Sequence, residues 1–267
     1  MVMSKRKIND TNNPLQDKIQ YLESLVNEKD TIIKKLKEQN IQRNLDLGLN
    51  LLNGVNINTD VGIKILTKIA EIGNSEAQFQ LGRNYIQGTY TLPDLDMGLY
   101  FLIEASNNGN DKADLVLGYI YDRGEHVLEN KQLAFSYYKK SAEGKNIEAI
   151  HELALYYFFG IYVKQDVEKA ISLLEKNKNY LRSNILLGKI YYRNNNLKKS
   201  LEYFTLATKC DDDFSYYMVG LIYFRGDNGV VQDINKSIDF FWKAINKGNL
   251  LAKCIMGELY YKGEHIE

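Results

Sequence analysis

The sequence contains little cysteine, little histidine and no excess of either charge. Its 267 residues include 2 Cys and 3 His, which is too few for a disulfide framework or for a zinc cluster of ordinary spacing. Lys and Arg number 34, as do Asp and Glu, so the formal net charge is +0. A neutral chain lacks the positive field by which general nucleic-acid binders attract a phosphate backbone. These absences argue against a disulfide-stapled protein and against a broadly basic nucleic-acid binder.

Long apolar segments are also absent. The longest nearly apolar stretch runs from Ala154 to Val163, about half of the roughly 20 residues that a membrane-spanning helix needs. Residues 1–14 carry positive charge but no apolar run follows them, so we interpret them as a flexible basic tail and not as a signal peptide. Together with the sparse cysteine, these features predict an intracellular, cytoplasmic protein that has no membrane partner.

The sequence does contain a repeated pattern. A small residue, usually Gly preceded by Leu, falls at positions 48, 82, 118, 154, 188, 220 and 257, at intervals of 32 to 37 residues. Tyr85, Tyr121 and Tyr223 each lie three residues after this position in their copies. Self-similarity at such a period is typical of proteins built from stacked helical repeats.

Each copy has a second half with the same kind of spacing. A loop that usually contains Asp precedes another small residue, at positions 62, 98, 134, 170, 200 and 237, and large apolar or aromatic residues follow. Both halves carry apolar residues at i, i+3, i+4 and i+7, the period of an amphipathic helix. We therefore predict pairs of helices that cross at their small residues, with Gly at the helix ends where positive φ is needed.

The combined string A…LG..Y..G.GV..D..KA..[WF][YF].KA…G resembles Sel1-like repeats, longer-period relatives of tetratricopeptide repeats. The resemblance covers residues 44–267 and implies an all-α fold, a right-handed α-solenoid of about six and a half stacked antiparallel helix pairs. The fourth full copy departs from the family pattern, because its inter-helix loop from Arg193 to Leu197 lacks the Gly and Asp positions. The last copy contains only its first helix.

Residues 15–43 carry a heptad pattern in place of the repeat. Positions 15, 19, 22, 26, 29, 33, 36 and 40 are spaced alternately by four and three residues, and all are apolar except Lys29 and Asn40. Such a seam is typical of a coiled coil, in which the two polar members would weaken packing but help to fix the register. Two interpretations stay open: a homodimer formed through residues 15–43, or a single helix that caps the first repeat, since a seam this short is marginal alone.

No arrangement of residues indicates catalysis. His126 and His265 occupy the same loop position in two distant copies, whereas His151 is expected on a helix that faces a groove. Neither Cys210 nor Cys254 stands near a His and a carboxylate in the sequence, as a nucleophile would require. Phosphate-binding glycine loops and metal-binding motifs are missing. We therefore predict a protein that is not an enzyme and that binds no cofactor or metal.

The candidate site is the concave face that the first helices of stacked pairs line. Positions 3 before and 1, 4 and 5 after the small residue should point into it, and the last of these repeatedly holds Arg or Lys. The predicted groove residues are Phe79, Arg83, Tyr119, Arg123, His151, Phe158, Lys189, Tyr192, Arg193, Tyr217, Phe224, Arg225, Tyr261 and Lys262.

Aromatic and Arg side chains dominate binding hot spots. The predicted function is therefore a protein–protein interaction scaffold that holds acidic or carboxylate-ended partner segments. One alternative is that the aromatic residues only pack between neighbouring repeats. Another is a single-stranded nucleic acid stacked on the rings, which the neutral charge and the single basic position per repeat disfavour, so no nucleic acid is expected as a partner. A hydrolase is the least favoured alternative, because the sequence shows no paired titratable groups.

Overall fold

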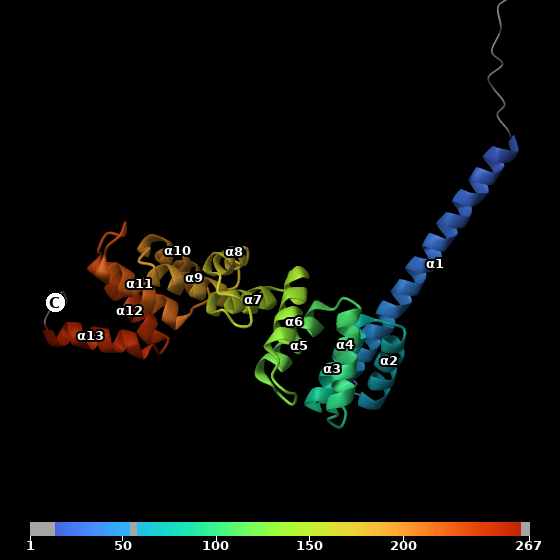
Figure 1. Ribbon diagram of the computed structural model, residues 1–267, viewed down its shortest axis with the longest axis horizontal. Coiled ribbons are helices and arrows are strands. Elements are labelled where there is room, and N and C mark those ends of the chain that lie inside the picture. Colours follow the sequence, from blue (N-terminus) through green and yellow to red (C-terminus); the bar gives the residue numbers. More distant parts are fainter. Residues whose placement is uncertain (1–13, 54–57, 263–267) are drawn as a thin grey trace, which may run out of the picture. The chain divides into compact units, whose positions relative to one another are not determined.

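The computed structural model describes residues 14–53 and 58–262, and in that part of the chain the regular elements are α-helices (Figure 1). The chain divides into two compact units, residues 1–108 and residues 109–267. None of the described helices combines the length and the apolar character needed to cross a membrane. The helices are α1 (Pro14–Asn53), α2 (Thr59–Glu71), α3 (Ser75–Gln87), α4 (Leu95–Asn107), α5 (Asp111–Arg123), α6 (Lys131–Glu143), α7 (Ile147–Phe159), α8 (Val167–Glu175), α9 (Leu181–Arg193), α10 (Leu197–Thr208), α11 (Asp213–Arg225), α12 (Ile234–Asn246) and α13 (Leu250–Lys262).

The first unit contains two helix pairs, α1 with α2 and α3 with α4. In the second pair the helices cross where Gly82 meets Gly98: a Cβ added at Gly82 would lie 3.0 Å from the carbonyl oxygen of Gly98 and 2.8 Å from Leu102. A Cβ at Gly98 would in turn lie 2.5 Å from the Ile86 side chain, so α3 and α4 run antiparallel at the crossing. The small residues are required because any side chain would separate the backbones.

The second unit continues the same arrangement. Helix α5 packs on α6, α7 on α8, α9 on α10 and α11 on α12, and each pair packs on the next, with α13 following α12. The small residues again lie at the crossings: Gly188 faces the ring of Phe204, and the Ser200 hydroxyl donates a hydrogen bond of 2.9 Å to the Gly188 carbonyl. Buried side chains between successive pairs, such as Leu187 and Phe204, form the core. Each unit is thus a stretch of an all-α helical-repeat solenoid, as the repeat pattern predicted.

The loop Asp of the repeat is the N-cap of the second helix. Asp94, Asp166 and Asp233 each accept a hydrogen bond from a backbone N–H in the first turn of α4, α8 and α12. Such a cap satisfies a donor that has no partner within the helix and typically contributes about 1 kcal/mol. The fourth copy, expected to lack this position, uses Asn196, whose side chain accepts from the Lys199 N–H at 3.1 Å. The amide replaces the missing carboxylate.

The helix ends match the predicted role of glycine. Gly88, Gly124 and Gly160 follow α3, α5 and α7 with φ of 64°, 66° and 70°. These values lie in the left-handed region, where a Cβ is disfavoured. Gly263, which the same reasoning placed at the end of the last first helix, lies outside the described residues.

Helix α1 has two parts with different surroundings. Residues 41–53 pack against α2 through Ile41, Leu45, Leu49 and Leu52. All side chains from residue 18 to residue 40 are exposed, including Ile19 at 51% and Leu36 at 59%, and this part of α1 extends beyond α2 (Figure 1). The interpretation of residues 15–43 as a cap on the first repeat is therefore wrong for residues 18–40. The helix is also continuous across the predicted boundary between residues 43 and 44.

Candidate functional site

In residues 109–267 the first helices of the pairs are α5, α7, α9, α11 and α13, and they carry the predicted groove residues of that unit. Between α7 and α9 the surface is hollowed into a depression of about 250 Å³. The side chains that line it are His151, Leu155, Arg182, Ile185, Leu186 and Lys189. The depression therefore combines an aliphatic floor with two cationic side chains.

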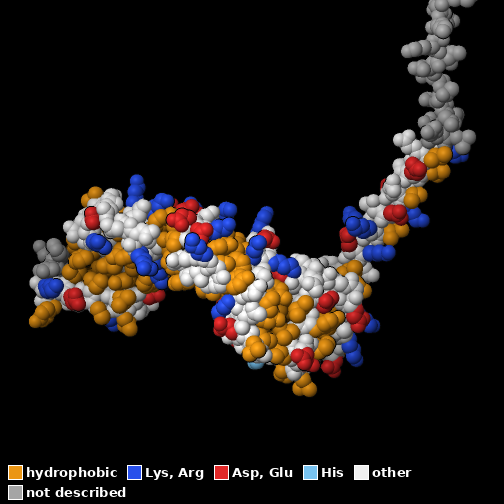
Figure 2. Space-filling view, viewed as in Figure 1, with side chains coloured by type: hydrophobic (Ala, Val, Ile, Leu, Met, Phe, Trp, Pro, Cys, Tyr) orange, Lys and Arg blue, Asp and Glu red, His pale blue; other side chains and the backbone are white. Residues whose placement is uncertain are grey.

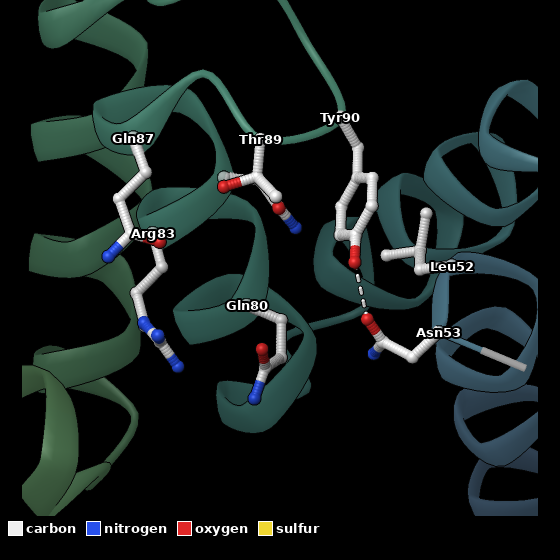
Figure 3. Close-up of a pocket in the computed structure, with 8 residues that line it drawn as sticks. Leu52, Asn53, Gln80, Arg83, Gln87, Thr89 and Tyr90 are labelled. Atoms are coloured by element: carbon white, nitrogen blue, oxygen red, sulfur yellow. Dashed lines mark hydrogen bonds between the residues drawn. The ribbon is translucent and has the colours of Figure 1, made fainter.

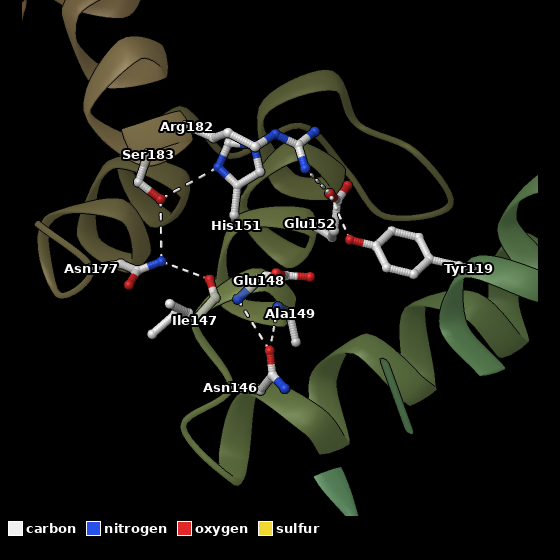
Figure 4. A network of polar contacts seen from close by, with 10 residues as sticks. All are labelled: Tyr119, Asn146, Ile147, Glu148, Ala149, His151, Glu152, Asn177, Arg182 and Ser183. Carbon is white, nitrogen blue, oxygen red and sulfur yellow. Dashed lines mark hydrogen bonds and ion pairs between the residues drawn. The ribbon is translucent and has the colours of Figure 1, made fainter. Parts of the chain in front are cut away.

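A polar network joins three first helices beside this depression (Figure 4). Glu152 on α7 accepts a hydrogen bond of 3.3 Å from the Tyr119 hydroxyl of α5 and pairs with the Arg182 guanidinium of α9 at 3.2 Å. The Glu152 side chain is 12% exposed, whereas that of Arg182 is 54% exposed. The carboxylate is thus enclosed, whereas the guanidinium is more than half exposed.

Burial changes the protonation behaviour of this network. Removal from water raises the pKa of Glu152, and the positive charge of Arg182 and the Tyr119 hydrogen bond oppose that rise. Burial, with the nearby charge of Glu152, also raises the pKa of Tyr119. Tyr119 therefore stays a neutral hydrogen-bond donor over the physiological range.

His151 faces the depression but is almost fully buried. It is 3% exposed, its Nδ1 lies 3.4 Å from the Ser183 hydroxyl, and its ring meets that of Tyr180 edge-on at 5.6 Å. Burial, and then the charge of Arg182, lowers the pKa of His151 to about 4. The imidazole is therefore neutral at pH 7 and packs α7 against the start of α9.

An asparagine positions the start of α9. Helix α8 has 9 residues, whereas the second helices α4, α6 and α12 each have 13, and the loop after α8 turns back over buried Asn177. The Asn177 amide donates to the Ile147 carbonyl at 2.7 Å and to the Ser183 hydroxyl at 3.2 Å. These bonds tie α7 to α9 and so fix where Arg182 stands.

The predicted basic line is exposed in this unit. Arg123 pairs with Glu125 at 3.2 Å and stacks over the Tyr119 ring at 5.0 Å. Arg193, Arg225 and Lys262 are exposed, and within the described part of the chain none of the three forms an ion pair. Lys189 is also exposed and lies 4.6 Å from the centroid of the Phe214 ring.

The predicted aromatic line is more buried than the basic one. Phe158, Tyr192, Tyr217 and Phe224 are half-buried and pack on the hydrophobic core clusters between repeats. The Tyr217 ring, for example, lies 6.2 Å from Phe241 and 6.1 Å from Phe214. These rings are partly exposed and also pack against neighbouring helices. Tyr261 differs, at 93% exposed.

Phe79 and Arg83 belong to the other unit and are described there. Phe79 is only 5% exposed, and the Arg83 guanidinium lies 5.6 Å above its ring. Arg83 also lines a polar depression of about 180 Å³, at whose edge the Tyr90 hydroxyl donates to Asn53 at 2.5 Å (Figure 3). Phe79 thus packs beneath Arg83 and is not an accessible anchor.

The sequence analysis missed the two residues at the centre of the network, Glu152 and Arg182. Neither occupies a position that recurs with the same chemistry, so a search for shared residues passes over them. The signal that could have found Glu152 is its departure from most copies of the repeat. The corresponding position is uncharged in five of them, as Gln80, Val116, Leu186, Met218 and Ile255, and only the degenerate first copy also carries a charge there, Asp46. A buried charge at a mostly apolar position calls for a partner.

The described residues hold no group of three or more His, Cys, Asp or Glu side chains that could bind a metal ion. Space-filling views show instead that hydrophobic side chains reach the surface over the helices, with Lys and Arg beside them (Figure 2). The surface therefore offers apolar and cationic contacts on the same helices.

Solved structures show the same fold. A protective antigen present in uropathogenic Escherichia coli strains, which displays an SLR fold, superposes with a TM-score of 0.78 at 24% identity, over 84% of this chain and 50% of the antigen. A Sel1 repeat protein from Oxalobacter formigenes superposes with a TM-score of 0.66 at 24% identity, over 78% of this chain and 88% of that protein. The chain thus spans half the length of the antigen, and at this identity both likenesses concern the fold alone.

No curated protein matches the sequence closely enough to be called a relative. The Sel1 repeat family model matches residues 75–110, 112–146, 147–176, 184–212 and 214–249, each of which begins at or near a first helix. Sel1 repeats are generally non-catalytic modules of protein–protein interaction. With more than half of its residues matched, the chain belongs to the Sel1 repeat family.

Proposed function

We propose that this protein is a non-catalytic scaffold that holds an acidic segment of a partner protein on the groove face of residues 109–267. The depression between α7 and α9 carries the proposal, because the aliphatic Leu155, Ile185 and Leu186 and the cationic Arg182 and Lys189 line it together. An apolar side chain of the partner fills the floor, and carboxylates on either side of it meet the two cations.

The contacts that Lys189 and Arg182 make within the chain support an acidic partner. Lys189 has no carboxylate partner within the described part of the chain, and its ammonium rests on the Phe214 ring. Arg182 is oriented by its bond to Glu152, so little conformational freedom is lost when its exposed donors meet a second carboxylate. The site is thus preorganised for negative charge.

The basic line extends the same preference along the unit. Arg193 at the end of α9 and Arg225 at the end of α11 occupy equivalent positions in successive repeats, and both are exposed. A partner segment with acidic residues on both sides of its apolar anchor can meet these residues in turn. Repeated weak charge contacts of this kind favour association and correct orientation more than raw affinity.

The scaffold also pairs with a second copy of itself through residues 15–43. Support comes from the exposed apolar side chains of α1, among them Leu22 at 52% and Val26 at 57%. Figure 2 shows hydrophobic side chains at the surface along α1, interspersed with charged ones. A dimer would present two groove faces and strengthen binding to a partner that carries two acidic segments.

The test is selection from a displayed library of random peptides on the immobilised full chain. We expect enriched peptides to contain an aliphatic or aromatic residue flanked by Asp or Glu, and Lys189→Glu to weaken their binding by at least about tenfold. The matched control is Lys198→Glu, an exposed lysine on the second helix α10 that does not line the depression.

Circular dichroism of both variants checks the fold. Equal loss of binding in both variants would mean that net charge alone drives capture. Enrichment of basic peptides would contradict the proposal that the partner segment is acidic. Tight binding of a single-stranded oligonucleotide that Lys189→Glu abolishes would replace the peptide by a nucleic acid.

A further inference from the structure

We infer that residues 15–43 associate as a parallel, in-register, two-stranded coiled coil. This inference rests on the proposed self-association and adds the number of strands and their direction. Two features of α1 support it: the residue type at each heptad position, and the face of the helix that the repeats leave open.

The alternation of residue types along the seam selects two strands. With a spacing of three residues from a to d, the a positions are Ile19, Val26, Ile33 and Asn40, and the d positions are Leu15, Leu22, Lys29 and Leu36. Every apolar a residue is β-branched and every apolar d residue is Leu. β-branched residues at a with Leu at d favour two-stranded parallel coiled coils over trimers and tetramers. The shape of each side chain decides how well it fits the hole formed by four residues of the facing helix.

Asn40 selects the direction. In a parallel, in-register pair the two Asn40 side chains face each other and can hydrogen-bond, which is the usual way in which a single Asn at an a position fixes register and strand number. In an antiparallel pair with full overlap of the seam, Asn40 would face Leu15 of the second copy. Its amide would then be enclosed without a hydrogen-bond partner, which disfavours this arrangement.

The charges at the edges of the seam agree with the parallel arrangement. There, the g position Lys18 lies beside the e position Glu23 of the second copy, and Lys29 lies beside Asp30 of the second copy, so both contacts are attractive. The antiparallel arrangement would instead bring Glu23 next to Asp30 of the second copy, a contact of like charges that occurs twice near the middle of the seam. The Asp30 contact also offsets the repulsion between the two Lys29 residues at d.

The fold leaves this seam free and helps it to form. The residues of α1 that pack on α2 include Ile41, Leu45 and Leu52, which are at b and f positions on the face opposite to a and d. Leu47, the next a position after Asn40, remains 48% exposed on the open side. Since the last turns of α1 are already held by α2, the seam extends an existing helix and the nucleation cost of an isolated peptide does not arise.

Two measurements on the full chain test the inference, in a background of Cys210→Ser and Cys254→Ser, both of which replace exposed cysteines. Sedimentation equilibrium at high protein concentration should give the mass of two chains. A cysteine at the d position, Leu36→Cys, should then form an intermolecular disulfide under mild oxidation, because facing d residues come within the roughly 7 Å that a disulfide requires. In an antiparallel pair the two copies of residue 36 would be about 25 Å apart along the helix axis.

The matched control is Glu38→Cys at an f position, on the outer face of the pair, which should cross-link far less than Leu36→Cys. Leu22→Cys, at a second d position, guards against local disruption by a single substitution. A one-chain mass would overturn the proposed self-association. A two-chain mass without cross-linking of either d-position cysteine would overturn only the parallel direction, and a three-chain mass would overturn only the number of strands.

Discussion

The first helices of the second unit have two faces that differ in the size of side chain that fits on them. Toward the second helix they present a small residue, and a Cβ added at Gly118, Gly188 or Gly220 would lie 2.5 to 2.8 Å from an aromatic ring. Toward the groove they present exposed charges such as Arg193 and Arg225. The small residue recurs at the crossing face because every helix pair has the same close backbone approach. Residues on the groove face are exposed, so the fold does not fix their identity, and a recurring residue there, such as the Arg of the basic line, is not explained by packing.

Helix α1 shows the same contrast within one element. Its last turns bury Leu45 and Leu52, at 4% and 2% exposure, against α2. Its earlier turns carry apolar residues of the same kind that nothing in the described chain covers. Apolar spacing thus predicts a helix in both parts, but only the contacts distinguish the face that packs within the chain from the face that stays exposed.

The largest change in stability should come from filling a helix crossing. Gly220→Leu places a side chain where even a Cβ would be 2.8 Å from Phe241 and 3.2 Å from the Ser237 carbonyl oxygen. Overpacking of this kind typically costs up to about 3 kcal/mol, and neighbouring repeats should lose stability with it. Urea denaturation followed by circular dichroism measures the loss in free energy of unfolding.

Gly257→Leu is the matched control for this substitution. Gly257 holds the equivalent position in α13, but nothing lies within 4 Å of an added Cβ in the described chain. Because Leu favours helix over Gly by about 0.8 kcal/mol, this variant should keep or gain stability. Equal destabilisation by both substitutions would show that the crossing contacts do not decide the effect.

Acidification should cause a smaller loss in the free energy of unfolding, through the buried His151. The pKa of His151 is about 4 in the fold and about 6.5 in an unfolded chain. Between these values the unfolded chain binds more protons, so the free energy of unfolding decreases as the pH falls from about 6.5 toward 4, by about 2 kcal/mol at pH 5.

The variant His151→Gln isolates this contribution, because it keeps a polar side chain near Ser183 but cannot titrate. The raised pKa of Glu152 acts with the opposite sign, since burial disfavours its ionised form, but Glu152 is present in both proteins. Chemical denaturation of both proteins at pH 7 and pH 5 should show a greater loss for the native chain. Identical losses would mean that His151 is solvated in the folded protein.

Features that recur in the repeats could be predicted from the sequence, whereas contacts made in a single repeat could not. The crossing residues and the helix-ending Gly were predictable because each satisfies a backbone requirement of the helix pair. The loop Asp was recognised as a recurring residue, but its role as N-cap comes from the structure. The pairing of Glu152 with Arg182 was not, since two unrelated positions meet only after α8 shortens and Asn177 redirects the chain. The spacing of Tyr217 left open whether its ring faces the groove or packs between repeats, because spacing cannot reveal that Phe241 and Phe214 lie against this ring.

The smallest effect on stability should come from the groove face itself. Arg193→Glu combined with Arg225→Glu replaces two exposed residues that form no ion pair within the described chain, and surface substitutions of this kind usually change the free energy of unfolding by less than about 0.5 kcal/mol. Binding of an acidic peptide should nevertheless weaken strongly, because each reversal turns an attraction into a repulsion. Arg193→Gln with Arg225→Gln separates the loss of attraction from added repulsion and should fall between the native chain and the double Glu variant. Fluorescence anisotropy measures the affinity of the three proteins for the peptide at low and at high salt. The differences between their affinities should be smaller at high salt, because salt screens the charges. If the double Glu variant unfolds, these arginines belong to the packing face, and the contrast between the two faces is wrong at this position.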